Sequence, residues 1–345
     1  MTHVYVGMSG GVDSSLTAAL LVEQGYNVTG VYMKNWTEDL PGMRCPWADD
    51  LADAKRVAVQ LGIDFKVFDF ETEYKHKVVD YMIDEYKAGR TPNPDIMCNQ
   101  EVKFKLFLDA SLEDGADMIA TGHYAQAQEG VLKQAADSNK DQTYFLYRVR
   151  GKALCKTLFP LGEYTKPQVR EMAKERGLYT AGKKDSQGIC FVGKVGIRDF
   201  LSQYVEQQPG KIIDKKTGNV IGQHDGAIFY TLGQRHGLEL GGGLPYYVVG
   251  KDMDKNEVYI TTDLNDISLW KNTVHLSSVH WINNAANEGE YTIRVRHRAP
   301  LVKAKLRYEN DDIILELNDA QRAVAAGQSV VIYDRDICLG GGIVV

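Results

Sequence analysis

Two cysteines stand in segments whose neighbouring residues favour a reactive thiolate. Cys98 ends the run RTPNPDIMC, in which two prolines exclude a helix up to about Asp95, so we expect a helix to start close to the thiol. A helix N-terminus stabilises a thiolate, and Asp95 is placed to move a proton. Cys190 follows Lys183 and Lys184, whose positive charges act in the same direction. Each cysteine is equally consistent with a small buried hydrophobic residue, the second one beside a solvated lysine pair.

A glycine-rich turn, SGGVDSS at residues 9–15, predicts a phosphate-binding site. Glycines let the backbone approach a phosphate closely, and the N-terminus of the helix that follows offers unpaired N–H groups and a positive dipole end. The turn lacks the lysine of a Walker A loop, so it is a different kind of nucleotide site. Taken alone, the paired glycines are as consistent with an ordinary strand-to-helix turn.

Three further cysteines, Cys45, Cys155 and Cys338, have no such neighbours and are interpreted as structural. None of the five cysteines belongs to a CxxC pair, and the histidines show no metal-ligand spacing. We therefore expect the protein chain itself to provide no metal site.

The first half of the sequence alternates strand and helix patterns, which predicts βαβ units and a parallel sheet covered on both faces. The glycine-rich turn follows the first of these strands. The expected strands are His3–Gly7, Val28–Met33, Phe65–Phe70 and Asp117–Thr121, and the expected helices are Ser14–Gln24, Leu51–Leu61, Glu73–Lys87 and Val102–Leu112.

The pattern changes near Gln207, where short strand-like runs separated by turn residues begin. Such spacing predicts an α/β domain over 1–206, a small β-rich central domain over 207–272 and a C-terminal β-barrel over 273–345. The expected strands are Lys211–Ile213, Ile228–Thr231, Tyr246–Val249, Val258–Thr261, Tyr291–Arg296, Val302–Arg307, Ile313–Leu317 and Val330–Tyr333.

Composition fits a multidomain globular protein. The 345 residues exceed one ordinary core, and 44% hydrophobic with 25% charged residues is a typical soluble balance. No apolar run is long enough for a bilayer, and the first residues lack a secretory pattern, so we expect a cytoplasmic location and no membrane association. The net charge of −6 argues against a generally basic nucleic-acid binder but permits local basic patches.

One such patch is expected at Arg294, Arg296 and Arg298. Alternate residues of a strand share a face, so the three guanidinium groups would form a basic stripe suited to phosphates. The same stripe is equally consistent with a solvated sheet face that nearby acidic residues balance.

Several motifs in this order resemble known families. The SGGVDSS turn is similar to the PP-loop of the ATP pyrophosphatase superfamily. Followed by RTPNPDxxCN, TGHYA, KKDSxGICF, TLGQR and a terminal CLGGG, it resembles the tRNA-specific 2-thiouridylase family over essentially the whole chain.

The resemblance implies an ATP-dependent replacement of the C2 oxygen of the wobble uridine of tRNA by sulfur, with AMP and pyrophosphate released. It implies a persulfide on Cys190, Cys98 as nucleophile and partner in a transient disulfide, and Asp95 as acid/base. It also implies magnesium with the ATP, and a cysteine desulfurase or sulfur relay protein as the persulfide sulfur donor.

The resemblance also assigns contact residues. Those implied for ATP are Gly7, Met8, Ser9, Gly10, Gly11, Val12, Asp13, Ser14, Met33 and Gly122. Those implied for tRNA are Asn93, Pro94, Asp95, His123, Lys140, Asp141, Gln142, Arg296, His297 and Gln328, the first three at the target base.

Two alternatives remain open. Another PP-loop enzyme, such as a ligase or amidotransferase acting on a small molecule, would need neither the paired cysteines nor a barrel. A sulfur relay or RNA-binding protein without catalysis would have no use for the intact SGGVDSS turn.

Overall fold

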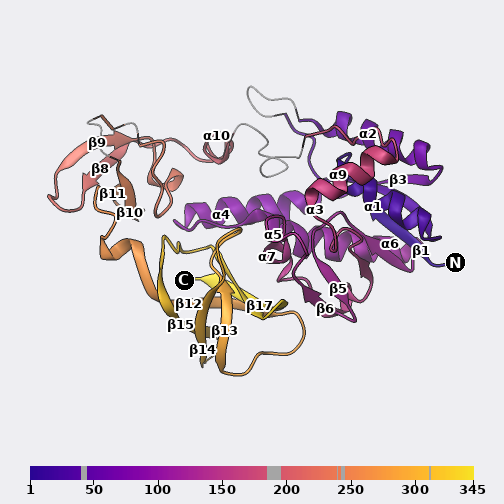
Figure 1. The fold of residues 1–345 in the computed structure, drawn as a ribbon. Helices are drawn as coiled ribbons and strands as arrows, with labels where there is room; N and C mark the ends of the chain where they lie inside the picture. The colour runs from indigo at the N-terminus through magenta and orange to yellow at the C-terminus, as the bar shows by residue number, and fades with distance from the viewer. Residues whose placement is uncertain (40–44, 185–195, 239, 242–244, 311) are drawn as a thin grey trace.

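The computed structural model describes residues 1–39, 45–184, 196–238, 240–241, 245–310 and 312–345. Cys190 lies outside these residues. Figure 1 shows an α/β domain that contains the N-terminus, a small β domain at the opposite end, and a barrel beside the long helix that runs between them. Within the described residues, no helix is both long enough and apolar enough to cross a membrane.

The α/β domain is built on a parallel sheet, as the sequence predicts. Its strand order is β3-β2-β1-β4-β7, and all neighbouring pairs run parallel. The strands are β1 His3–Gly7, β2 Asn27–Lys34, β3 Asp64–Asp69, β4 Met118–Ala120 and β7 Thr157–Leu158.

Helices cover both faces of this sheet because successive strand residues point to opposite sides. Val4 and Val6 of β1 are buried with residues of α1 (Val12–Glu23) and α2 (Trp47–Leu61), whereas Tyr5 is buried in the cluster of the other face. Helix α9 (Lys166–Glu175) packs against α1. The connections therefore bring the glycine-rich turn to the carboxyl edge of the sheet.

Two long helices cover the other face, and each contains a π-helical segment. The first comprises α3 Glu71–Tyr74, η1 Lys75–Asp80 and α4 Tyr81–Lys87; the second comprises α5 Pro94–Met97, η2 Cys98–Leu106 and α6 Phe107–Glu113. The second helix starts earlier than expected. Proline fits the first helical position because its missing N–H needs no partner there, and the Asn93 side chain caps the helix by accepting from the Asp95 N–H.

The central domain is a four-stranded sheet in the order β10-β11-β8-β9. Its strands are β8 Gly210–Asp214, β9 Val220–His224, β10 Tyr247–Asp252 and β11 Glu257–Thr261. The strand expected at Ile228–Thr231 is wrong, since the chain forms a 3₁₀ turn, η3, at Ala227–Phe229. These residues are buried, and a short apolar run does not by itself distinguish a strand from a buried turn.

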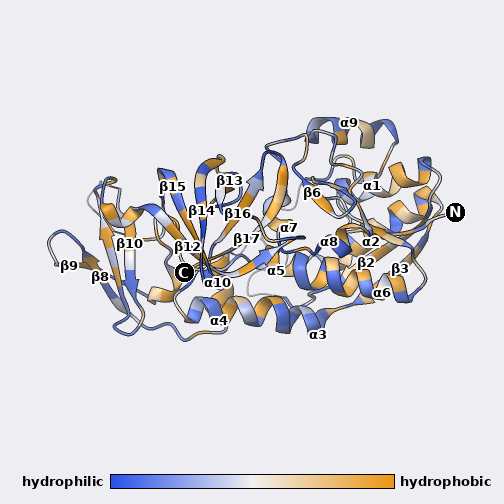
Figure 2. Ribbon diagram, turned by 90° about the horizontal axis from the view of Figure 1, so that it is seen from below, coloured by the Kyte–Doolittle hydropathy of each residue, from blue (hydrophilic) through white to orange (hydrophobic). Residues whose placement is uncertain are grey.

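The C-terminal domain is a closed barrel, as predicted. Strand order runs β12-β15-β14-β13-β16-β17, and a β12–β17 pairing closes it. The alternating colours of β14 in Figure 2 follow its alternation of buried and exposed residues. The strands are β12 Trp270–Trp281, β13 Gly289–Arg294, β14 Val302–Glu309, β15 Asp312–Arg322, β16 Ser329–Asp334 and β17 Ile337–Val344.

A hairpin of the α/β domain extends the barrel sheet. β6 (Val131–Lys133) pairs with β17 at Ile337 and Cys338, and β5 (Gln126–Gln128) pairs with β6. The barrel is thus fastened to the α/β domain by backbone hydrogen bonds. The shorter elements are α7 Thr143–Leu146, α8 Gly151–Leu154, α10 Ile197–Leu201 and η4 Ile267–Leu269.

Candidate active site

The glycine-rich turn is braced by its own hydroxyl groups. The Ser14 and Ser15 hydroxyls donate to the Gly11 carbonyl at 3.2 and 2.8 Å, and the Ser9 N–H donates to the Ser14 hydroxyl at 3.1 Å. Gly11 is the N-cap residue of α1 and has no side chain with which to cap it. The first N–H groups of α1 therefore point out of the turn without partners inside the helix, an arrangement suited to an anion.

The other residues assigned to ATP by resemblance converge on this turn. A Cβ atom at Gly122 would lie 2.9 Å from the Asp13 carbonyl carbon and the Ser14 nitrogen, and one at Gly7 would lie 2.9 Å from Met33 Cε. Gly10 has a φ of +71°, a left-handed conformation that favours glycine. The carboxyl ends of β1 and β2 and the residues after β4 thus come together around the turn.

A buried lysine that the motifs do not include also reaches the turn. Lys166, at the start of α9, donates to both Asp13 carboxylate oxygens at 2.7 and 2.8 Å, and Tyr124 donates to the same carboxylate at 2.9 Å. The Lys166 side chain is 10% exposed. The capping box of Thr165 and Gln168 marks the start of α9, but nothing in the sequence places that start beside residue 13.

The segment that leads to Cys190 leaves from the same region. Lys183 donates to the carboxylates of Asp50 and Asp53 on α2, both at 2.7 Å. A Cβ atom at Gly10 would collide with the Asp50 backbone, so this part of α2 touches the turn directly. The last described residues before the 185–195 segment are therefore anchored next to the glycine-rich turn.

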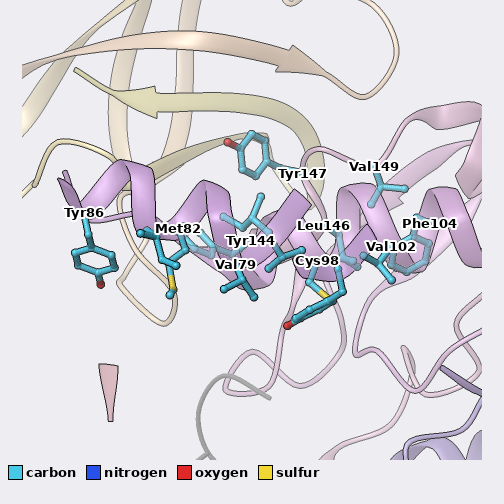
Figure 3. Packing of buried hydrophobic residues seen from close by; sticks show 14 of the residues in the cluster. Val79, Met82, Tyr86, Cys98, Val102, Phe104, Tyr144, Leu146, Tyr147 and Val149 are labelled. Atoms are coloured by element: carbon cyan, nitrogen blue, oxygen red, sulfur yellow. The ribbon is translucent and has the colours of Figure 1, made fainter. Parts of the chain in front are cut away.

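Cys98 lies in the second long helix with its side chain 5% exposed. Figure 3 shows its sulfur close to the side chains of Val102 and Leu146 in the hydrophobic cluster. Asn99 donates to the Phe145 carbonyl at 3.1 Å, which fixes the helix against α7. Burial raises the pKa of the Asp95 carboxyl, and the charge of Lys103 opposes that rise.

The Cys98 helix connects the thiol to the glycine-rich turn without crossing the sheet. The Phe104 ring lies 5.6 Å from the ring of His123, which directly follows Gly122, and a Cβ atom at Gly7 would lie 3.5 Å from Phe107. At a rise of about 1.5 Å per residue, the thiol is on the order of 10 Å along the helix from Phe104. The thiol and the turn belong to the same edge of the molecule.

Residues assigned to tRNA fall into two groups that the fold assembles from distant segments. In the first, the His297 ring packs at a tilt against Phe145 with ring centroids 4.4 Å apart, and the charges of Lys140 and Asp141 act on the same imidazole. Burial, with Arg298 and Arg294, lowers the pKa of His297 to about 4. This imidazole is therefore neutral near pH 7.

The second group lies along the Cys98 helix, from its start after Asn93 to the Phe104 ring beside His123. The Gln328 side chain donates to the Thr91 carbonyl at 2.7 Å, close to Asn93, Pro94 and Asp95. His123 is buried, its Nδ1 lies 2.8 Å from the Thr121 hydroxyl, and burial lowers the pKa of its imidazole well below the usual value. Gln142 holds the segment after His123, since its Oε1 accepts from the Tyr124 N–H at 2.9 Å.

The expected basic stripe is wrong. β13 ends at Arg294, and the backbone then turns, with Arg298 at a φ of +61°. Arg294 is buried and donates to Asp141 at 2.8 Å, with side-chain exposures of 8% and 1%. The strand ends too early for the three residues to share a face, and Arg294 serves a buried ion pair rather than the surface. Arg296 remains exposed.

The other cysteines have different surroundings. Cys45 and Cys338 are buried, and burial raises the pKa of both thiols, whereas Cys155 is exposed. Within the part of the chain that the structure describes, no three His, Cys, Asp or Glu side chains gather as a metal site would require.

Three family models match the chain in succession. They are described as the tRNA methyl transferase HUP domain over residues 2–194, the tRNA methyl transferase PRC-barrel domain over 198–262 and the aminomethyltransferase beta-barrel domain over 271–344.

Two solved structures are similar to parts of the chain. A 4-thiouridine synthetase in complex with RNA and bound ATP is 18% identical, with a TM-score of 0.40 over 59% of this chain and 50% of that one. NMN synthetase from Francisella tularensis is 16% identical, with a TM-score of 0.35 over 54% of this chain and 66% of that one. Both scores are low, so neither contributes to the assignment.

Curated relatives extend over nearly the full length. Proteins named tRNA-specific 2-thiouridylase MnmA from Bacillus thuringiensis (strain Al Hakam), Bacillus anthracis and Bacillus mycoides (strain KBAB4) are each 47% identical over 348 aligned residues. The alignments cover 99% of this chain and 94% of each relative. An α/β domain with a glycine-rich turn, a buried cysteine on a helix that reaches this turn and an appended barrel accompany this identity, and the chain belongs to the tRNA-specific 2-thiouridylase family.

Proposed function

We propose that this enzyme replaces the C2 oxygen of the wobble uridine of tRNA by sulfur, using ATP and the thiols of Cys98 and Cys190. Membership of the thiouridylase family supports thiolation of tRNA. The observation that carries the detailed proposal is that the helix of Cys98 reaches the glycine-rich turn, with Phe104 beside His123 and Phe107 beside Gly7.

The turn fits the triphosphate of ATP. Its outward N–H groups, the positive end of α1 and the Lys166 ammonium all favour phosphate oxygens. Met33, next to Gly7, is suited to contact the adenine ring. A magnesium ion would be held by phosphates and water, as this cation prefers, because both Asp13 carboxylate oxygens already accept from Lys166. Bound ATP supplies the adenylyl group that turns the uracil C2 oxygen into a leaving group.

Two thiols are then sufficient for sulfur transfer. The terminal sulfur of a Cys190 persulfide attacks C2, and the C2–O bond breaks with the oxygen leaving on AMP. The Cys98 thiolate next attacks the Cys190 sulfur, the S–S bond to the transferred atom breaks, and 2-thiouridine is released. The product of this step is a Cys98–Cys190 disulfide, so each turnover consumes two electrons that an external dithiol must return.

The remaining residues receive roles that agree with their surroundings. Asp95, whose pKa is raised by burial, is suited to exchange protons with the target base or with Cys98. Asn93 and Pro94 would touch the base, which must leave its stack to reach the site. His123, Lys140, Gln142, Arg296, His297 and Gln328 are proposed RNA contacts. Asp141 is buried against Arg294, so we assign it to orienting its neighbours.

The persulfide must come from a donor such as a cysteine desulfurase or a sulfur relay protein, and we infer that the enzyme works in the cytoplasm. Both inferences follow from the chemistry of a transient persulfide, which needs a reducing compartment and a protein that delivers sulfane sulfur.

Mass spectrometry of nucleosides tests this proposal directly. The protein is incubated with tRNA, ATP and a persulfide source, and thiouridine and pyrophosphate are measured together. We expect one 2-thiouridine per pyrophosphate, and no 2-thiouridine from Cys98→Ser or Cys190→Ser. The exposed Cys155→Ser variant is the matched control and should retain full activity.

Each alternative function has its own signature in the same experiment. Activity that survives loss of both thiols would favour a PP-loop enzyme acting on a small molecule. Sulfur bound by the protein with no release of pyrophosphate on adding tRNA would favour a relay protein. Either result would overturn the proposal.

A further inference from the structure

Thr91 lies directly upstream of Asn93, the residue that caps the Cys98 helix. Its backbone N–H donates to the Ala326 carbonyl at 2.8 Å, and its carbonyl accepts from the Gln328 side chain at 2.7 Å. Its hydroxyl lies 3.0 Å from the hydroxyl of Thr231. All three polar groups of Thr91 are thus held by residues of the barrel and the central domain, and we call this cluster the Thr91 junction.

Close packing makes the Thr91 junction stiff. Gly327 has a φ of +88°, and a Cβ atom there would lie 2.7 Å from the Thr91 nitrogen. A Cβ atom at Gly89, just before the junction, would lie 2.8 Å from Met253 Cγ of the central domain. Gly327 packs against the Thr91 backbone and Gly89 against the Met253 side chain, so a shift of either domain is passed to residues 89–91 through this dense packing.

Both flanks of the Thr91 junction are fixed as well. The Arg90 guanidinium donates to both carboxylate oxygens of Glu85 at 2.7 and 2.5 Å, which ties the junction to the end of α4. On the central-domain side, the Lys251 ammonium donates to the Tyr230 carbonyl at 2.8 Å, next to Thr231. The segment that contains Asn93, Asp95 and Cys98 therefore begins directly downstream of a fixed point.

We propose that Thr91 is a positioning residue that links the barrel and the central domain to the catalytic segment at Asn93–Cys98. Gln328, a proposed RNA contact, belongs to the Thr91 junction. Binding of tRNA at the barrel and the position of Cys98 are therefore linked through the Thr91 carbonyl. The inference rests on the proposed function in that Asn93–Cys98 is the segment that meets the target base.

Substitutions can remove the contact between the Thr91 and Thr231 hydroxyls and leave the rest of the junction in place. Thr91→Val keeps the shape and the backbone hydrogen bonds of Thr91 and removes only its contact with Thr231. We expect kcat for thiolation to fall about tenfold, since a displacement of 1 Å at a reacting group can cost about a hundredfold. The KM for tRNA should stay within about twofold of wild type, and the unfolding temperature within about 2 °C. Thr91→Ser keeps the hydroxyl and should retain the wild-type kcat.

Further variants distinguish positioning from a merely structural role. Thr231→Val should produce the same loss of kcat, and the double variant should be no worse than either single one, because both remove one shared contact. Thr217→Val, the same change at an exposed turn of the central domain, should have no effect. Wild-type kcat in Thr91→Val, or losses that add in the double variant, would overturn the inference.

Hydrogen exchange separates failure of this inference from failure of the proposed function, because it needs no activity. Amides of residues 93–98 should exchange faster in Thr91→Val and at the wild-type rate in Thr91→Ser. Absence of thiouridine from the wild-type enzyme would refute the proposed function, whereas unchanged exchange in Thr91→Val would refute the inference alone.

Discussion

Asp95 is the titratable side chain of the catalytic segment whose acidity the fold alters. Burial favours its neutral form and raises the pKa of the carboxyl above the ordinary 3.8, against the opposing charge of Lys103. The proton is therefore retained to a higher pH than in a solvated aspartate. A base of this kind acts only in its ionised form, so the rate should rise as pH increases through that raised pKa.

Replacing Asp95 by Asn should remove this rise of the rate with pH. We expect kcat to fall by about a hundredfold or more, the usual contribution of a positioned acid or base, and the acid side of the profile to become flat. Thiolation rates measured across the acidic range check this outcome, with Asp109→Asn, at an exposed position of α6, as the control. A variant that keeps the acid limb of the wild type would show that another group titrates there.

Residue types and spacing identify the glycine-rich turn and the segments of Cys98 and Cys190, whereas the family resemblance is what assigns them to ATP and to sulfur transfer; Cys190 lies outside the described residues. Lys166 and Thr91 could not be found in this way. Each acts through contacts with residues far along the chain, Asp13 in one case and Thr231 with Gln328 in the other. Arg294 was predicted to lie on an exposed basic face but is buried against Asp141. A strand pattern identifies residues that share a face but not which of them will be buried.

At the scale of elements, the turn requires a close approach between α1 and the segment after β4. Gly122→Ala would place a Cβ atom 2.9 Å from backbone atoms of Asp13 and Ser14, so the turn must shift. We expect the KM for ATP to rise at least about tenfold, since misplaced N–H groups lose their hydrogen bonds to phosphate. ATP-dependent pyrophosphate release measures this effect.

Gly250→Ala is the matched control for this change. A Cβ atom at Gly250 would lie 3.9 Å from the Tyr259 ring, an ordinary van der Waals distance, so the KM for ATP should not change. Equal KM values for Gly122→Ala and wild type would mean that the turn tolerates displacement or does not bind the phosphates.

The period of the hydrophobic pattern predicted the parallel strands and most helices, because long amphipathic elements repeat it many times. The ends of helices and strands depend on local chemistry that this period does not capture. Prolines at 92 and 94 suggest a loop, yet Pro94 starts a helix that Asn93 caps. The hairpin of β5 and β6 has too few residues for a recognisable pattern, and its partner β17 lies at the other end of the chain.

At the scale of the whole molecule, Arg294 and Asp141 join the barrel to the α/β domain through a buried ion pair. Arg294→Met should lower the free energy of unfolding by about 3 kcal/mol or more, because the Asp141 charge would remain buried without its cation. Denaturant titration measures the change.

Arg307→Met is the control for the loss of an arginine from the barrel. Arg307 pairs with Glu316 at 3.2 Å, but their side chains are 49% and 43% exposed, so the loss should stay below about 1 kcal/mol. Similar destabilisation by both variants would contradict the view that burial decides the effect.

The central claim is that the turn and the thiols act on one atom, the C2 oxygen of the target uridine. Labelling that oxygen with ¹⁸O in tRNA and weighing the AMP after a single turnover tests the claim most directly. We predict one ¹⁸O atom in the AMP for each 2-thiouridine formed, with none in pyrophosphate. Unlabelled AMP alongside newly formed 2-thiouridine would contradict adenylation of the uracil oxygen and with it the account of this site.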